Sequence, residues 1–354
     1  VGLDEPYRDS IIIMLKYLYM IASFYSMQLF AMDMNHCDYS EDELGKRYPV
    51  SMNHEMDESL NQLRMSIPSL EKMTNGQIMG MMKMMGPNYY WPVSKNGSTN
   101  YGVLIMAHGY GPGGDLDLFN SVQDIGLDYQ TTLSMGMSMM TSTHVICSVN
   151  EMIHNNVEKI FVVPVSSTAH NTLVRQWNYI FSIEDKYAYS DVEQIKNENI
   201  VMLDPISDHM YAKKIILEYT NEISIDPENE ALIIIAHGPI DETDNKVELL
   251  LMDNIGQYIK KHTNINTIKA FTLQDDAPKQ IRENNLENIK AFMKASQDEG
   301  KRVLMVSNLM SGQGIQRKLS KDFEGFDYVF NSKGLLTHPY YIEWIKESVK
   351  AHTE

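Results

Sequence analysis

Two short, continuously apolar runs, each followed directly by His-Gly, constrain the fold of this chain most strongly. Residues 102–107 read GVLIMA and precede His108, and residues 231–236 read ALIIIA and precede His237. Continuous apolar runs of this length are typical of strands that helices cover on both faces of a parallel sheet. The sequence therefore predicts two buried strands, each of which delivers a histidine at its carboxyl end.

The spacing of four histidines indicates an internal duplication. His108 and His237 are 129 positions apart, and the same offset separates His209 from His338. The members of the second pair each follow an apolar strand and precede an amphipathic helical pattern. Two pairs with one offset and similar flanks favour duplication over a coincidence between generic patterns.

Apolar runs alternate with helical patterns through both halves of the chain. Further strands are expected at 159–165, 200–203, 302–306 and 328–330, and helices at 142–156, 247–260 and 286–293. Such alternation predicts an α/β fold of two duplicated Rossmann-like lobes with parallel sheets flanked by helices. We expect the lobes at 98–224 and 225–354, a linker at 226–229, and an N-terminal extension over 1–97.

The extension begins with a mostly apolar stretch, residues 11–32, which carries one charge, Lys16. A signal peptide or anchor, a marginal transmembrane helix and a packed helix all fit this pattern. Acidic residues before the stretch argue against a signal peptide, which prefers positive charge there. A signal peptide or anchor implies a protein that is extracytoplasmic, for example periplasmic, or associated with the membrane. A packed helix implies a cytoplasmic protein.

Methionine is concentrated in the rest of the extension, where 12 of the 26 methionines fall within 27–85. Thioether and imidazole groups bind soft copper ions, so an accessory metal site is one interpretation. Its residues would be Met32, Met34, His36, Met52, His54 and Met56, with Cys37 beside them. For residues 79–85, which contain no His or Cys, we prefer methionine as filler of a helix core or a partner groove. The aromatic run at 89–92 is expected to pack on the first lobe.

Charge and cysteine content exclude several classes of protein. The formal net charge is −17 and no basic patch occurs, which argues against nucleic-acid binding. An acidic surface instead concentrates metal cations. The only two cysteines, Cys37 and Cys147, exclude a disulfide framework and a zinc site of four thiolates, and we favour two free thiols over one bridge. The sequence leaves both a monomer and a homo-oligomer open.

The candidate site lies at the strand ends, because open α/β sheets bind ligands outside the carboxyl ends of their strands. After His108 the sequence predicts a flexible glycine-rich loop with Gly109, Gly111 and Gly113. It matches neither a Walker A loop nor a dinucleotide fingerprint, so no nucleotide is expected. His170 follows the run 159–165 and should enter the same crevice as His108. Two neutral imidazoles there predict a site that binds a divalent metal and accepts protons.

These residues carry a family resemblance. The pattern LIMAHGxGxGG, then KIFVVPVxxxxH, then a strand leading to DPISDH resembles the class II chelatases, above all the sirohydrochlorin cobaltochelatases and their ferrochelatase relatives. The resemblance covers residues 101–354 and implies a tetrapyrrole cleft between two lobes. It implies a lyase-type enzyme of cobalamin or porphyrin biosynthesis that inserts Co, Ni or Fe into a sirohydrochlorin-like macrocycle. His108 and His170 match the family's metal-holding histidines.

The remaining site residues follow from the strand ends and the resemblance. We expect substrate contacts from Gly109, Gly111, Gly113, Ser166, Ser167, His209, His237 and His338. His209 and His338 either bind substrate carboxylates or cap helices. Asp115 and Glu184 are candidate proton acceptors, although a solvated position is the preferred interpretation for both.

Two departures from the family pattern keep a second function open. The second half has no histidine in 307–315, the loop equivalent to that of His170, so the first lobe is the expected active one. Residues 166–169 are largely polar where the family has apolar residues. This substitution and the Met/His-rich extension favour the alternative of a non-catalytic metal or tetrapyrrole carrier. The absence of a G-x-S-x-G motif argues against a third hypothesis, that the protein is a hydrolase.

Overall fold

The computed structural model describes residues 37–50, 56–94, 97, 99–312 and 315–353. The chain divides into two units, Val1–Asp38 and Tyr39–Glu354, and the second unit contains both sheets. The apolar stretch 11–32 lies outside the described residues, as do Met32, Met34, His36, Met52 and His54 of the predicted accessory metal site. In the part of the chain that the structure describes, no helix is both long and apolar enough to cross a membrane.

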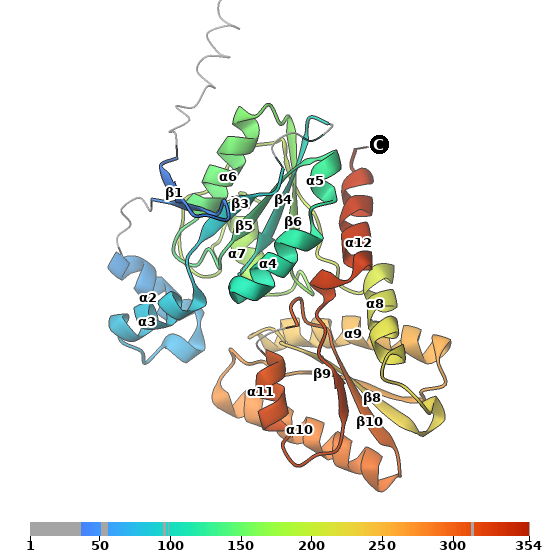
Figure 1. Ribbon diagram of the computed structural model, residues 1–354. Helices are drawn as coiled ribbons and strands as arrows, with labels where there is room; N and C mark the ends of the chain where they lie inside the picture. The colour runs from blue at the N-terminus through green and yellow to red at the C-terminus, as the bar shows by residue number, and fades with distance from the viewer. Residues whose placement is uncertain (1–36, 51–55, 95–96, 98, 313–314, 354) are drawn as a thin grey trace, which may run out of the picture. The chain divides into compact units, whose positions relative to one another are not determined.

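The first half builds a seven-stranded mixed sheet (Figure 1). Its strands are β1 (Tyr39–Glu41), β2 (Arg47–Pro49), β3 (Tyr89–Pro92), β4 (Tyr101–Ala107), β5 (Gln130–Met135), β6 (Lys159–Pro164) and β7 (Ile200–Met202). The order is β1-β2-β3-β5-β4-β6-β7. The last four strands in this order pair in parallel, whereas β1, β2 and β3 extend the sheet by antiparallel pairing next to β5.

The second half builds a four-stranded parallel sheet. Its strands are β8 (Glu230–Ala236), β9 (Thr267–Thr272), β10 (Arg302–Ser307) and β11 (Val329–Asn331). The order β9-β8-β10-β11 repeats the order β5-β4-β6-β7 of the first sheet. The predicted α/β fold with two duplicated lobes is therefore confirmed. We call the sheet β1–β7 with its helices the first lobe, and the sheet β8–β11 with its helices the second lobe.

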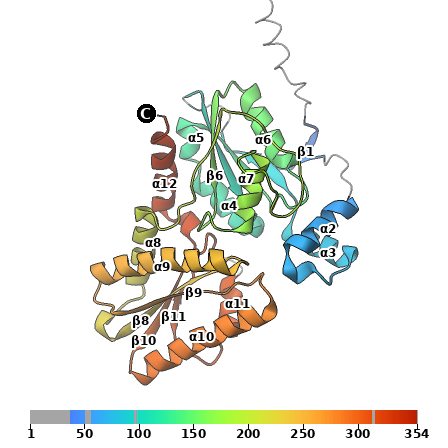
Figure 2. The same ribbon diagram turned by 180° about the vertical axis from the view of Figure 1, so that it is seen from behind.

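Helices cover both faces of the parallel strands because alternate side chains of each strand point to opposite faces. In the first lobe, Val103 and Ile105 share an apolar cluster with α4 and α5, whereas Leu104 and Met106 pack with α6 and α7. Figure 2 shows these helices around the strands of the sheet. The helices are α2 (Met56–Ser66), α3 (Asn75–Met85), α4 (Gly111–Ser121), α5 (Ile125–Asp128), α6 (Thr143–His154), α7 (Thr172–Ile180), α8 (Met210–Asn221), α9 (Glu242–His262), α10 (Lys279–Asp298), α11 (Ile315–Asp322) and α12 (Pro339–Lys350).

The last helix of each half packs on the other lobe. In α8, the Tyr219 hydroxyl donates to the Gly334 carbonyl at 2.8 Å, and its own carbonyl accepts from Asn331 Nδ2 at 3.0 Å. Beyond α12, the His352 ring lies 6.1 Å from the ring of Phe161 on β6. One apolar cluster accordingly contains residues of both sheets together with α8 and α12. This exchange joins the lobes and fixes the ends of their central strands relative to each other.

Two local expectations are wrong and a third needs refinement. The glycine-rich segment after His108 is not a loop throughout, because α4 begins at Gly111 with Pro112 in its first turn, a position proline favours. Both cysteines are disulfide-bonded, so the preference for free thiols is wrong, since distance along the chain says little about distance in the fold. The aromatic run 89–92 does pack on the first lobe, but as strand β3.

A small helical layer, α2 and α3, precedes β3. Its buried residues include Leu60, Leu63 and Ile78, which cluster with Met139 and Met140 beyond the end of β5. Within the methionine-rich α3, Ile78 is the buried residue, whereas Met84 is 81% exposed. The interpretation of these methionines as core filler therefore holds only in part. Met56, the described member of the predicted accessory metal site, is exposed at the start of α2.

Candidate functional site

A cavity of about 520 Å³ opens at the carboxyl ends of the parallel strands of both lobes. Its walls come from the turns after β4, β5 and β6 in the first lobe and after β8, β9 and β10 in the second. Open α/β sheets bind ligands at this edge, and the volume is in the range of small-molecule sites. The cavity is therefore the candidate functional site.

His108 reaches the cavity from the end of β4. The chain turns sharply at Gly109, whose φ of 92° lies in the left-handed region that glycine adopts readily. Burial lowers the pKa of His108, and the nearby His237 lowers it further, although a hydrogen bond with the Gly109 backbone opposes the shift. The ring is consequently neutral at pH 7, the form that binds metals and accepts protons.

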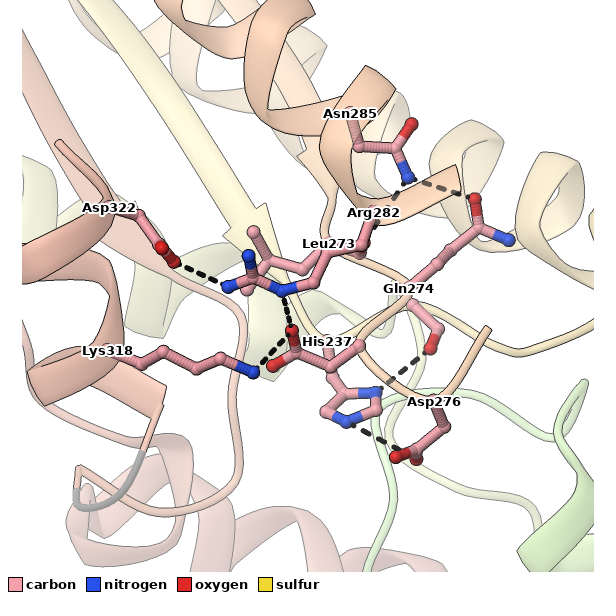
Figure 3. A network of polar contacts seen from close by, with 10 residues as sticks. His237, Leu273, Gln274, Asp276, Arg282, Asn285, Lys318 and Asp322 are labelled. Atoms are coloured by element: carbon pink, nitrogen blue, oxygen red, sulfur yellow. Dashed lines mark hydrogen bonds and ion pairs between the residues drawn. The ribbon is translucent and has the colours of Figure 1, made fainter. Parts of the chain in front are cut away.

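His237 reaches the same cavity from β8, the equivalent strand of the second lobe. Its Nδ1 lies 2.9 Å from the Gly238 carbonyl oxygen, which can only accept, so in the neutral ring Nδ1 carries the proton. The other nitrogen, Nε2, then presents a lone pair and lies 3.6 Å from Asp276 Oδ2 (Figure 3). A histidine held at one nitrogen by a carbonyl can bind a metal through its other nitrogen, which here has the Asp276 carboxylate beside it.

An ion-pair network holds the turn that carries Asp276. Its neighbour Asp275 accepts hydrogen bonds from Arg282 and Lys318, and Arg282 also binds Asp322 at 2.5 Å (Figure 3). Burial acts to raise the pKa of Asp275, but the two cations outweigh it and the pKa is lowered. Because Asp275 is fixed in this way, the adjacent carboxylate stays beside the His237 ring.

Glu248, on α9, is a buried carboxyl in the cavity wall. Burial raises its pKa, although the hydrogen bond that Ser167 Oγ donates to its Oε1 at 3.0 Å and the charge of His237 act in the opposite direction. Glu248 therefore keeps its proton to a higher pH than an exposed glutamate. Sequence reasoning missed it. The available signal was a charged residue on the buried face of α9, one turn before Met252.

Several predicted site residues line the cavity and others do not. Gly109, Ser166 and Ser167 line it together with the two histidines described above, whereas Gly111 and Gly113 lie in α4. His170 has an exposed side chain and is not among the lining residues. The structure thus brings His108 together with His237 rather than with His170.

The other residues predicted for the site do not line the cavity. His209 and His338 cap α8 and α12, since their Nδ1 atoms accept from the backbone N–H groups of Tyr211 at 3.3 Å and Tyr340 at 3.2 Å. Helix capping was one of the two expected roles for this pair.

The two candidate carboxylates lie outside the lining as well. Asp115 is 6% exposed, so the expectation of a solvated side chain is wrong. It accepts from the Tyr89 hydroxyl at 2.7 Å and from the Tyr110 backbone at 2.6 Å. Glu184 accepts from Asn178 at 3.1 Å.

A resident metal centre would require a denser set of ligands. Among the described residues, no group of three or more His, Cys, Asp or Glu side chains is arranged so that it could hold a metal ion. The two cavity histidines can supply two ligands, and water or a bound molecule would complete the coordination.

No family model matches the chain, and no curated protein matches it. Among solved structures, SirB from Bacillus subtilis with Fe³⁺ is similar, with a TM-score of 0.52 and 12% identity over 72% of this chain and 98% of that chain. DR2241 from Deinococcus radiodurans, a multi-domain protein described as structurally similar to chelatases, gives a TM-score of 0.41 and 11% identity over 70% of this chain and 54% of that one. At these identities the likeness concerns the fold, and the fold is chelatase-like.

Proposed function

We propose that this protein is a lyase-type metal chelatase, which inserts a divalent metal ion into a sirohydrochlorin-like tetrapyrrole in the cavity. One observation carries the proposal: His108 and His237, at equivalent ends of duplicated strands, line a single cavity. The metal is the substrate of this reaction and leaves with the product.

The metal we propose is Co²⁺, Ni²⁺ or Fe²⁺, all of which imidazole binds well. The similar fold of SirB, solved with Fe³⁺, supports a transition metal in this setting. The two histidines would take up the hydrated ion, and the neutral state of His108 leaves its ring free to replace a water ligand. The exposed side chain of His170 favours His237 as the second ligand. The sequence-based assignment to His170 stays a prediction that a variant can test.

Insertion exchanges protons for the metal. The metal-free macrocycle gives up two pyrrole N–H protons as one M²⁺ enters, so charge is balanced and two bases are needed. The bases we propose are Glu248 in its ionised form and a histidine that has already given up the metal to the macrocycle. The apolar part of the wall, including Val165, Ile240, Leu309 and Met310, would pack against the faces of the flat ring.

Absorbance spectroscopy with sirohydrochlorin and Co²⁺ tests the function. We expect the spectrum of the metallated macrocycle to appear faster with the protein than without it. Tight binding of the macrocycle with no rate above the spontaneous one would instead support the second candidate, a carrier without turnover. The polar loop Ser166–Thr168, where chelatases of this class have apolar residues, favours that alternative. Absence of both binding and turnover would contradict both functions.

We also propose that the protein works in an oxidising, extracytoplasmic compartment. Both cysteines are disulfide-bonded, and disulfides persist mainly outside the reducing cytosol. A signal or anchor function for residues 11–32 agrees with this location. Thiol titration of denatured protein purified without reductant should detect no free thiol, and prior reduction should release two. Detection of two thiols before reduction would contradict the proposal.

A further inference from the structure

Asn308 is a cavity residue with an unsatisfied acceptor. It follows β10 directly, lines the cavity and is 3% exposed. Its side-chain oxygen, Oδ1, is buried and has no hydrogen-bond partner among the described residues. A buried acceptor without a donor is costly, so native structures leave few of them and often satisfy them with a ligand or a water.

The duplication shows that the fold does not need this amide. The Asn308 backbone N–H donates to the Ile235 carbonyl of β8 at 2.8 Å, and the Val165 N–H donates in the same way to Met106 of β4 at 2.8 Å. Val165 is therefore the structural equivalent of Asn308 in the first lobe, and both residues line the cavity. Since valine occupies the equivalent position, the amide must be explained by the cavity rather than by the sheet.

The position of Asn308 limits what it can bind. Ser307 pairs with Ile235 across β10 and β8, so Asn308 lies one strand away from the segment Ala236-His237. Tyr110, another lining residue, also has an unpartnered buried hydroxyl, but a hydroxyl can either donate or accept. An amide oxygen only accepts, so its partner must be a donor, here an N–H or O–H of the ligand beside the histidine that we propose as a metal ligand.

We propose that Asn308 Oδ1 accepts a hydrogen bond from an inner pyrrole N–H of the metal-free macrocycle, so that this bond favours substrate over product. The inference rests on the proposed function. The metal-free ring carries two inner N–H donors, and the metallated ring carries none, because the metal has replaced their protons. Insertion would therefore remove the donor, leave Oδ1 unsatisfied and favour release of the product.

Binding titrations test this preference without turnover. The wild-type protein, without added metal, is titrated with metal-free sirohydrochlorin and, separately, with its cobalt form. These two affinities are the reference for a variant, because the cobalt of the metallated form can also bind the histidines that line the cavity. In Asn308→Val, which copies Val165 of the other lobe, the affinity for the metal-free form should fall about tenfold while that for the cobalt form stays unchanged. Asn266→Val, at an exposed position directly before β9, is the matched control and should change neither affinity.

The outcomes separate the inference from the function. An unchanged affinity of Asn308→Val for the metal-free form would overturn the inference and leave the chelatase or carrier function standing. The same holds if Asn308→Val weakens both forms equally, which would indicate a structural role. Failure of the wild-type protein to bind either form would overturn the proposed function and this inference with it. Asn308→Ala, which removes the same acceptor, gives the same comparison if the valine variant does not fold.

Discussion

Replacing either His108 or His237 with alanine is expected to lower the rate of metal insertion by at least about 100-fold. Each change removes one of the two imidazoles that line the cavity, and with it one of the groups that we propose as metal ligand and base. The two variants should be about equally impaired, because the duplicated strands present the rings from opposite lobes. The measurement is the initial rate of cobalt insertion at saturating macrocycle, with circular dichroism to verify folding.

His170→Ala is the control that decides between the two assignments of the second ligand. Its exposed side chain lies outside the cavity lining, so we expect a rate within about twofold of the wild-type rate. A large loss in His170→Ala combined with a normal rate in His237→Ala would contradict the pair of histidines proposed above and restore the pair suggested by the sequence.

Glu248→Gln is expected to lower the insertion rate by about 100-fold and to flatten its pH profile. Glutamine keeps the shape and the oxygen that accepts from Ser167, but it cannot take a proton. Because burial raises the pKa of Glu248, the wild-type rate should increase with pH above the range where an ordinary glutamate ionises. A rising limb that persists unchanged in the variant would assign the titration to another group.

The same substitution should stabilise the protein at neutral pH. Above the ordinary pKa of 4.5 the unfolded chain ionises Glu248, while the folded chain holds the proton until its raised pKa is passed. The wild-type free energy of unfolding therefore falls as pH rises through this window, by about 1.4 kcal/mol for each unit of pKa shift. Glutamine removes this loss.

Urea unfolding of both proteins at pH 4 and pH 7.5 measures the difference. We expect the gain in stability of Glu248→Gln at pH 7.5 only. A gain of equal size at both pH values would show that packing, not ionisation, distinguishes the variant. A loss of rate together with a gain in stability would mark Glu248 as a residue kept for chemistry.

The hydrophobic pattern of the sequence predicted the strands that are continuously apolar. Strands β4 and β8 were predicted because every residue from Val103 to Ala107, and from Ala231 to Ala236, is apolar and buried. Strand β5 was missed because it reads QTTLSM, and its buried threonines, Thr131 and Thr132, resemble an exposed segment when only the sequence is known. The sheet buries these polar side chains, and the sequence alone does not reveal that burial.

The site was predictable within one lobe but not across two. His108, Ser166 and Ser167 follow strands of the same sheet, so the rule on strand ends brings them together. His237 was expected to bind substrate and not metal, because its position beside His108 depends on how the two lobes pack through the exchanged helices α8 and α12. Nothing local in the sequence encodes that packing. Glu248 left a local signal, a charge on the buried face of α9, but its hydrogen-bond partner Ser167 belongs to the other lobe.

A count of the imidazoles bound to Co²⁺ tests the central claim most directly. X-ray absorption spectra of the cobalt-loaded protein, without macrocycle, report the number of histidine rings around the metal. The shared cavity predicts two rings in the wild-type protein and in His170→Ala, and one ring in His108→Ala and in His237→Ala. A wild-type spectrum without imidazole, or a count that is unchanged in His237→Ala, would contradict a metal site built from both lobes.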